Sequence, residues 1–348
     1  MTKKSAKAAR TRDPVLVDFA LQGGGSHGAF TWGVLDRLLE EPWLAIDGIS
    51  GTSAGAMNAA VLVHGYEIGG AVGARMALET FWRRVSEAGR FSPIQRSPVD
   101  VLLGRWTMDF SPAYIAVDLM SRLFSPYDLN PKGGNPLREI LAALIDFERL
   151  AKSPINLFVT ATNVRTGRGK VFKNNAITPD VLLASACLPT MFQAIEIDGE
   201  AYWDGGYSGN PTLSTLIREC KSQDTILIPI NPIEREGVPR TASEISNRLN
   251  EVSFNAVVSK ELRMMALLRQ VADPGDGEGA LWASMRIHLV RNDIMTRLGA
   301  SSKLNTEWAF LSFLRDEGRK SAQVFLETNA MDLGHRSTLD LDVFLQGI

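Results

Sequence analysis

The pentapeptide Gly51–Gly55, which reads Gly-Thr-Ser-Ala-Gly, constrains the fold more than any other part of this 348-residue chain. It stands directly before the helix-forming run Ala56–Val63. A serine at a sharp strand-to-helix turn, with small residues on both sides, exposes its hydroxyl at the edge of a sheet. The N-terminus of the following helix adds partial positive charge and free N–H groups beside that hydroxyl. We therefore predict that Ser53 is a nucleophile, although a glycine-rich chain also produces this pattern by chance.

A glycine-rich loop follows the first expected strand. Val15–Leu21 is an apolar run of strand length, and it leads into Gly23–Gly28, which reads Gly-Gly-Gly-Ser-His-Gly. Backbone N–H groups with no side chains in front of them suit an oxyanion as well as a phosphate. The loop also matches the dinucleotide fingerprint G-x-G-x-x-G, and Asp47 lies near the position of its ribose-binding acid. The residues after Asp47 lead directly into the serine turn, which a dinucleotide-binding domain does not need. We therefore favour the oxyanion interpretation and keep a dinucleotide-binding oxidoreductase as an alternative.

A third motif supplies a candidate base. The short segment Glu200–Trp203 leads to Asp204, which Gly205 and Gly206 follow. An activated serine needs a neighbouring base, and Asp204 reaches Ser53 if the ends of the two strands meet at one edge of the sheet. An aspartate before two glycines is also an ordinary turn signal, so the three motifs carry weight only in combination.

In this order, the three motifs resemble those of the patatin-like phospholipase family. Its members carry a glycine-rich oxyanion loop, a Gly-x-Ser-x-Gly serine and an Asp-Gly-Gly or Asp-Gly-Ala aspartate, and the resemblance covers roughly the first two-thirds of this chain. It implies a three-layer α/β/α fold with a mainly parallel central sheet. It also implies a lipid acyl hydrolase of the phospholipase A or esterase type, in which a Ser53–Asp204 dyad works through an acyl-enzyme without a histidine base or a cofactor.

The same resemblance assigns roles to the glycines around the serine. We expect backbone N–H groups of Gly24 and Gly25, joined by that of Ala54, to hold the oxyanion. The complete set of glycines implied for the oxyanion hole and for the turn at the nucleophile is Gly23, Gly24, Gly25, Gly28, Gly51 and Gly55.

One residue of the loop departs from the family pattern. Family members usually have arginine or lysine at the position of His27. A permanent cation attracts anionic head groups at any pH, whereas histidine does so mainly below neutrality. The sequence therefore supports ester hydrolysis more strongly than a preference for phospholipids. His27 is either a substrate contact or a loop histidine that packs against the following helix.

A competing class of enzyme keeps the serine but uses a histidine base. The chain order of α/β-hydrolases is serine, acid, histidine, and both His288 and His335 follow Asp204. His288 lies in an alternating strand pattern, and His335 lies in a polar turn near the end of the chain. Neither has the loop context of a catalytic base.

The rest of the chain is predicted to elaborate one α/β domain, because 348 residues with 45% hydrophobic content allow a sizeable core. We expect a disordered basic arm over residues 1–12, a catalytic domain over 13–232 and a mainly helical extension, packed on the core, over 233–348. An insertion at 91–129 is rich in large apolar side chains but contains several prolines, so we expect it to be irregular. One interpretation is a cap, which lines an acyl pocket or meets a lipid surface. The other is that these side chains simply pack on the core.

Further elements follow from hydrophobic periodicity and turn signals. Strands are expected over 154–162, 225–230 and 285–290, a hairpin turns about Asp198 and Gly199, and helices are expected over 137–150, 180–188, 241–271 and 305–327.

Composition limits the partners. A net charge of −2 without a basic stripe gives no reason to expect nucleic acid, and no metal site is indicated. Cys187 and Cys220 have neither metal-like nor redox spacing, so we expect free thiols in a reducing compartment. The N-terminal arm lacks the apolar core of a secretory signal, and no stretch is apolar enough to cross a bilayer. The sequence therefore predicts a cytoplasmic protein that binds a lipid or acyl ester, with the basic arm available for transient contact with a membrane surface.

Overall fold

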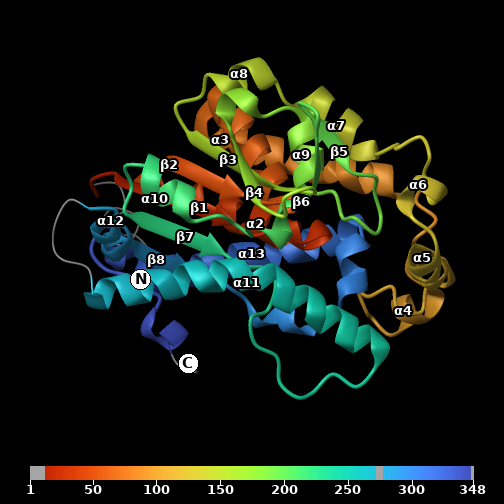
Figure 1. Ribbon diagram of the computed structural model, residues 1–348. Helices are drawn as coiled ribbons and strands as arrows, with labels where there is room; N and C mark the ends of the chain where they lie inside the picture. Colours follow the sequence, from red (N-terminus) through yellow and green to blue (C-terminus); the bar gives the residue numbers. More distant parts are fainter. Residues whose placement is uncertain (1–11, 272–276, 346–348) are drawn as a thin grey trace.

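The computed structural model describes residues 12–271 and 277–345, and its centre is a mainly parallel β-sheet (Figure 1). The strand order is β5-β6-β3-β2-β1-β7-β8, and β4 pairs with β3. Strands β3, β2, β1, β7 and β8 are parallel, whereas β4 and β6 run antiparallel to β3. The strands are β1 (Val15–Leu21), β2 (Leu44–Gly51), β3 (Asn156–Asn163), β4 (Gly169–Lys173), β5 (Ile195–Ile197), β6 (Glu200–Asp204), β7 (Asp224–Ile228) and β8 (Arg286–Leu289).

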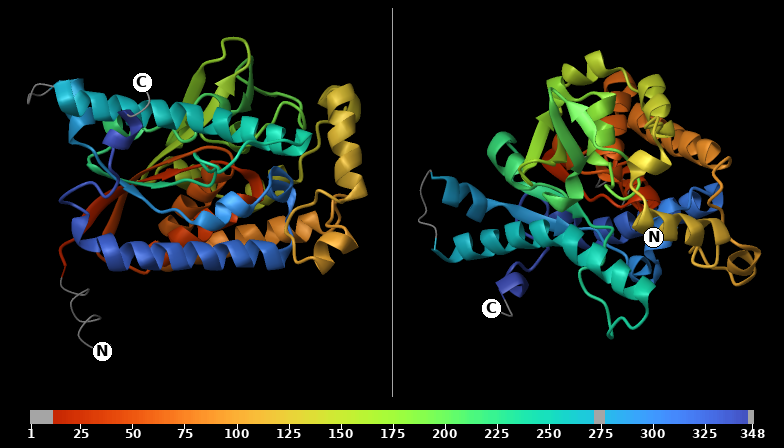
Figure 2. Two further views of the ribbon diagram at one scale, coloured as in Figure 1. Left: turned by 90° about the horizontal axis from the view of Figure 1, so that it is seen from below. Right: turned by 45° about the vertical axis from the view of Figure 1, so that its right-hand side comes forward.

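Helices cover both faces of the sheet, which confirms the predicted three-layer α/β/α fold. In the left view of Figure 2, α11 (Ala242–Val271) and α13 (Trp308–Asn329) lie on opposite sides of the strands. The other α-helices are α2 (Gly28–Leu38), α3 (Ala54–Gly89), α4 (Pro98–Leu102), α5 (Pro112–Leu123), α6 (Pro126–Leu129), α7 (Pro136–Leu144), α8 (Phe147–Ala151), α9 (Pro179–Ser185), α10 (Ser214–Glu219) and α12 (Glu278–Ser284).

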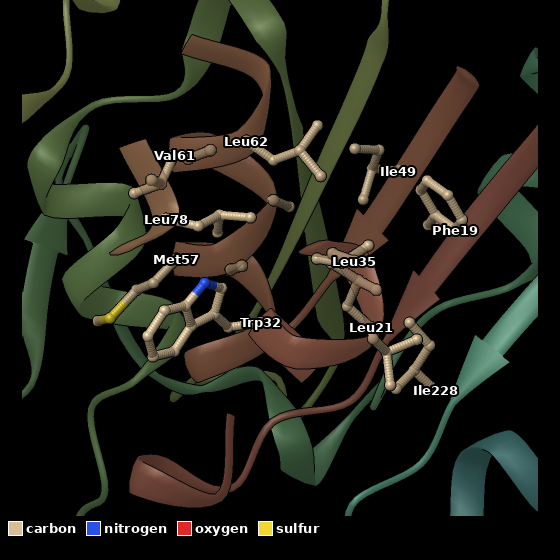
Figure 3. Packing of buried hydrophobic residues seen from close by; sticks show 14 of the residues in the cluster. Phe19, Leu21, Trp32, Leu35, Ile49, Met57, Val61, Leu62, Leu78 and Ile228 are labelled. Atoms are coloured by element: carbon tan, nitrogen blue, oxygen red, sulfur yellow. The ribbon is translucent and has the colours of Figure 1, made fainter. Parts of the chain in front are cut away.

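The main hydrophobic core lies between the sheet and the helices α2 and α3. Phe19 of β1 and Ile49 of β2 face Leu35 of α2 and Leu62 of α3, and all four side chains are fully buried (Figure 3). Helix α13 packs against α2 and adds buried side chains to the same core. The burial of this apolar face fixes the ends of β1 and β2, from which the glycine loop and the serine turn emerge.

Most of the elements predicted from sequence are present with shifted ends. The predicted hairpin joins β5 to β6, and both Asp198 and Gly199 have positive φ, as a tight hairpin turn requires. Helix α11 begins with a capping box, in which Thr241 and Glu244 bond each other's backbone N–H groups. The segment after residue 233 is not only helical, because β8 joins the sheet beside β7.

Two predictions about helices were wrong. The insertion at 91–129 is not irregular throughout, since about half of it forms α4, α5 and α6. Three of its four prolines, Pro98, Pro112 and Pro126, occupy the first helical position, where the fixed φ is favourable and a missing N–H costs nothing, and a serine precedes each of them. The single helix expected over 137–150 is two helices, because Ile145 is extended and Asp146 caps α8.

The insertion lies beyond the carboxyl ends of β1, β2 and β7 (Figure 1). Its helix α5 has no buried residue, and many of its large apolar side chains are exposed. Trp106 is an exception, because its ring lies 5.7 Å from that of Phe313 in a stacked arrangement.

Residues 1–11 of the predicted basic arm lie outside the described residues. Arg12 places its guanidinium 4.1 Å from the ring centroid of Trp43. In the described part of the chain, no helix combines the length and hydrophobicity needed to span a bilayer.

Candidate active site

Ser53 occupies a strained turn between β2 and α3, as the sequence predicts. Its φ of 54° and ψ of −122° lie in a region that residues other than glycine rarely adopt, at a typical cost of about 1–3 kcal/mol. Its N–H group donates to Oγ of Ser185 at 2.8 Å, and that hydroxyl donates to the carbonyl of Thr160 at 2.7 Å. The turn is therefore held from outside, with the Ser53 side chain at the N-terminus of α3.

The glycine loop lies directly against this turn. A Cβ atom on Gly23 would stand 2.7 Å from the Cβ of Ser53, so only glycine allows this approach. Two asparagine side chains hold the same residue: the N–H of Gly23 donates to Oδ1 of Asn210 at 2.6 Å, and its carbonyl accepts from Nδ2 of Asn231 at 2.8 Å.

The four glycines predicted for the oxyanion hole differ in what their N–H groups do. That of Gly23 is used by Asn210, and that of Gly28 donates back to the carbonyls of Gly25 and Ser26. The N–H groups of Gly24 and Gly25 have no acceptor among the described residues. Gly23 and Gly28 therefore shape the loop, and Gly24 and Gly25 remain the predicted donors.

Asp204 ends β6 and is almost completely buried, with 1% of its surface exposed. Its Oδ1 accepts the N–H of Gly206 at 2.7 Å. Burial raises the pKa of this carboxyl to about 7, against the opposing effects of the Gly206 N–H, the Ser53 side chain and the charge of Lys303. The fold thus brings Asp204 to Ser53, and a carboxylate with a pKa near neutrality is a stronger base than an exposed one.

His27 lies beneath the loop. It is 3% exposed, its Nε2 is 2.7 Å from Oγ of Ser302, and its ring stands edge-on to that of Phe310. Burial and the nearby charges of Lys303 and Arg235 hold its pKa well below the usual value, so the ring is neutral. This placement favours the packing role over contact with substrate.

The other candidate histidines lie away from Ser53. His288 is buried, with Nε2 at 2.9 Å from Oδ1 of Asp224 and Nδ1 at 3.2 Å from Oγ1 of Thr338. Asp224 begins β7, at the opposite end of the sheet from Ser53. His335 is exposed on the turn after α13. Neither histidine is hydrogen-bonded to Ser53 or Asp204, so the geometry gives no support to a histidine base.

Asp47 does not have the geometry of a ribose-binding acid. Its carboxylate is buried and accepts the N–H groups of Lys221 and Ser222. It forms a group with Asp18 and Cys220, whose ligand-type atoms all lie within 4.8 Å of one another. Burial and the charge of Asp47 raise the pKa of Asp18 to about 8, so that carboxyl is mainly protonated at neutral pH. Among the described residues, these three groups have atoms of the type and spacing that could hold a metal, and they lie away from the serine turn, near the β1–β2 bulge.

Several residues around the site were not identified from the sequence. Ser185, Asn210 and Asn231 hold the turn and the loop through hydrogen bonds, and Lys303 donates to Asn231. Both asparagines stand immediately before a proline, which is a local signal for a turn. Lys303 has no comparable signal.

Comparison with known proteins gives a family. Residues 19–217, more than half of the chain, match the family model described as "Patatin-like phospholipase". No curated protein matches the chain. Among solved structures it is similar to the "Crystal structure of VipD from Legionella pneumophila", with 15% identity, 91% of this chain and 67% of that chain covered, and a TM-score of 0.41, which is too low to support an inference. The family match contains all three motifs, and the chain belongs to the patatin-like phospholipase family.

Proposed function

We propose that this protein hydrolyses acyl esters of lipids, with Ser53 as the nucleophile and Asp204 as the general base. Membership of the patatin-like phospholipase family supports a lipid hydrolase. The dyad is supported mainly by one observation: the buried carboxylate of Asp204 lies beside the hydroxyl of Ser53, at the N-terminus of α3. The glycine loop, with two N–H groups that have no acceptor among the described residues, lies against the same serine.

In the proposed first half-reaction, Oγ of Ser53 attacks the acyl carbonyl while Asp204 accepts the hydroxyl proton. The N–H groups of Gly24 and Gly25 stabilise the tetrahedral oxyanion. When the intermediate collapses, the bond to the alcohol breaks, the alcohol takes the proton from Asp204, and the acyl group stays on Ser53. In the second half-reaction, Asp204 accepts a proton from water, the hydroxide adds to the acyl-enzyme, and a fatty acid leaves as the proton returns to Ser53.

This mechanism predicts a dependence on pH. Only the ionised form of Asp204 accepts the serine proton, and burial raises its pKa to about 7. The rate of ester hydrolysis should therefore rise with pH through neutrality.

We also propose that the segment α4–α6 touches the surface of lipid aggregates. Phe110 is 51% exposed and Leu123 is 68% exposed, and both lie in the insertion at the carboxyl ends of the strands. A group of exposed apolar side chains at this edge suits contact with acyl chains, because burial in lipid removes apolar surface from water.

Labelling with a fluorophosphonate probe tests the proposal, since the probe reacts with an activated serine whatever the natural substrate. We expect the unmodified protein to be labelled and to hydrolyse nitrophenyl esters. Ser53→Ala should abolish both, whereas Ser284→Ala, at an exposed serine on α12, should change neither. Labelling that persists in a folded Ser53→Ala variant would refute the assignment.

A further inference from the structure

Lys303 comes from the C-terminal part of the chain, outside the segment that matches the family. It lies in the short helix η6 (Ala300–Leu304), which packs against the glycine-loop helix η2 (Gly25–His27). Gly25 has a positive φ, and any Cβ atom placed on it would collide with the carbonyl of Lys303. The backbone of the glycine loop is therefore in close contact with the backbone of this segment.

The ammonium group of Lys303 is connected to the loop through one side chain. Its Nζ donates to Oδ1 of Asn231 at 2.7 Å, and Nδ2 of Asn231 donates to the carbonyl of Gly23 at 2.8 Å. The backbone of Asn231 is fixed in turn, because its N–H donates to Oε1 of Gln22 at 2.7 Å. The side chain of Asn231 thus links Nζ of Lys303 to the glycine loop.

The titratable groups that face Lys303 come from four parts of the chain. Asp204 lies at the end of β6 and Glu251 lies on α11, while Arg235 follows β7 and the neutral His27 lies in η2. Glu251 is already paired with Arg235 at 2.6 Å and with Arg248 at 3.2 Å. Asp204 forms no ion pair within 4 Å among the described residues, and Lys303 is the cation whose charge acts on it. Cys187 and Tyr207, which also face Asp204, carry no charge near neutral pH.

The glycine loop itself supplies no cation. Its only ionisable side chain is that of His27, which is buried, neutral and directed at Ser302.

We propose that Lys303 is a positioning residue of the acyl-hydrolase site, whose positive charge favours the ionised form of Asp204 and whose hydrogen bond to Asn231 holds the glycine loop. This inference rests on the proposed function and extends it to a residue beyond the family segment. Asp204 and Lys303 stabilise each other's charged form, because opposite charges in a poorly solvated site interact more strongly than in water.

The pKa values agree with this arrangement. Burial lowers the pKa of Lys303 to about 8, against the raising effect of Glu251 and Asp204. Ester hydrolysis should therefore rise through pH 7 as Asp204 ionises, in a pH range where Lys303 is still mainly protonated.

Three variants separate charge from hydrogen bonding. Lys303→Gln keeps a donor for Asn231 but removes the charge, Lys303→Arg keeps both, and Lys320→Gln removes a charge from an exposed lysine on α13 as a control. We expect kcat/KM for a soluble nitrophenyl ester at pH 7 to fall about fivefold in Lys303→Gln, with the acidic limb of its pH profile shifted upward by about one unit. Lys303→Arg should stay within a few-fold of the parent at pH 7 and leave the acidic limb in place, because arginine keeps the positive charge.

A second measurement does not need activity. The pH at which Asp204 ionises in the folded protein follows from the difference in unfolding free energy between each protein and its Asp204→Asn counterpart. It should move upward in Lys303→Gln and not in Lys320→Gln. An unchanged ionisation of Asp204 in Lys303→Gln would overturn the inference. Failure of the proposed function is recognised separately, because the parent protein would then neither react with the fluorophosphonate nor hydrolyse an ester.

Discussion

Asp204→Asn should raise stability while it removes activity. The carboxyl has a pKa of about 7 in the folded protein against 3.8 as the ordinary value, a difference of about 3 units. At about 1.36 kcal/mol per unit, ionisation costs the folded state about 4 kcal/mol, and the burial of Asp204 leaves little solvent screening to reduce it. Because the folded form binds the proton more tightly, stability is highest below pH 3.8 and falls as the pH rises to about 7.

Asparagine lacks this titration but still has an oxygen to accept the N–H of Gly206. Relative to the parent, the variant should gain up to about 4 kcal/mol of unfolding free energy between pH 4 and pH 8. Urea denaturation at several pH values measures this difference, with Asp316→Asn, at an exposed aspartate on α13, as a control. A difference that stays constant with pH would refute the argument that Asp204 is ionised at the expense of stability.

The same substitution should reduce ester hydrolysis at least roughly a thousandfold, about as much as Ser53→Ala, because the two residues act as one unit. Activity within tenfold of the parent at pH 8 would show that another group accepts the serine proton.

Three further predictions concern the surroundings of the dyad. Ser185→Ala removes the acceptor for the N–H of Ser53, so kcat should fall about tenfold or more and the unfolding free energy should fall by about 1–3 kcal/mol. Steady-state kinetics and urea denaturation measure the two effects, and an unchanged kcat would mean that the serine turn keeps its geometry without Ser185. Replacing Phe110 and Leu123 by serine should lower hydrolysis of micellar lipid several-fold and leave soluble esters and the melting temperature nearly unchanged, whereas equal losses on both substrates would exclude a lipid contact. His288→Ala should lower the melting temperature, because Asp224 loses a buried partner, and should keep most activity in folded protein; a loss as large as that of Ser53→Ala would point to a histidine base.

The serine turn, the glycine loop and the hairpin before Asp204 could be predicted from sequence because each depends on neighbouring residues. Glycine permits positive φ at Gly25 and Gly199, and apolar runs of strand length precede the loop and the turn. The relative order of the three motifs then gave the family resemblance, which the family match confirms.

The supports of the site could not be predicted in this way, since they are created by tertiary contacts. Lys303 reaches Asn231 across 72 positions of sequence, and Ser185 reaches Ser53 across 132. The insertion was misjudged for a different reason: its prolines were taken as helix breakers, whereas serine before proline is a signal for the start of a helix. His27 could not be assigned because its role depends on burial beneath η6.

The position of β8 shows that the part of the chain with the catalytic motifs is shorter than the part that completes the sheet. All three motifs precede residue 207, yet β7 has β1 on one side and β8 on the other, and β8 comes from residues 286–289. A shorter chain that ended after β7 would leave this apolar strand as an open edge, able to pair with the same strand of another molecule. The last third of the sequence therefore supplies the strand that covers the edge of β7, so it contributes to the sheet even where it touches no substrate.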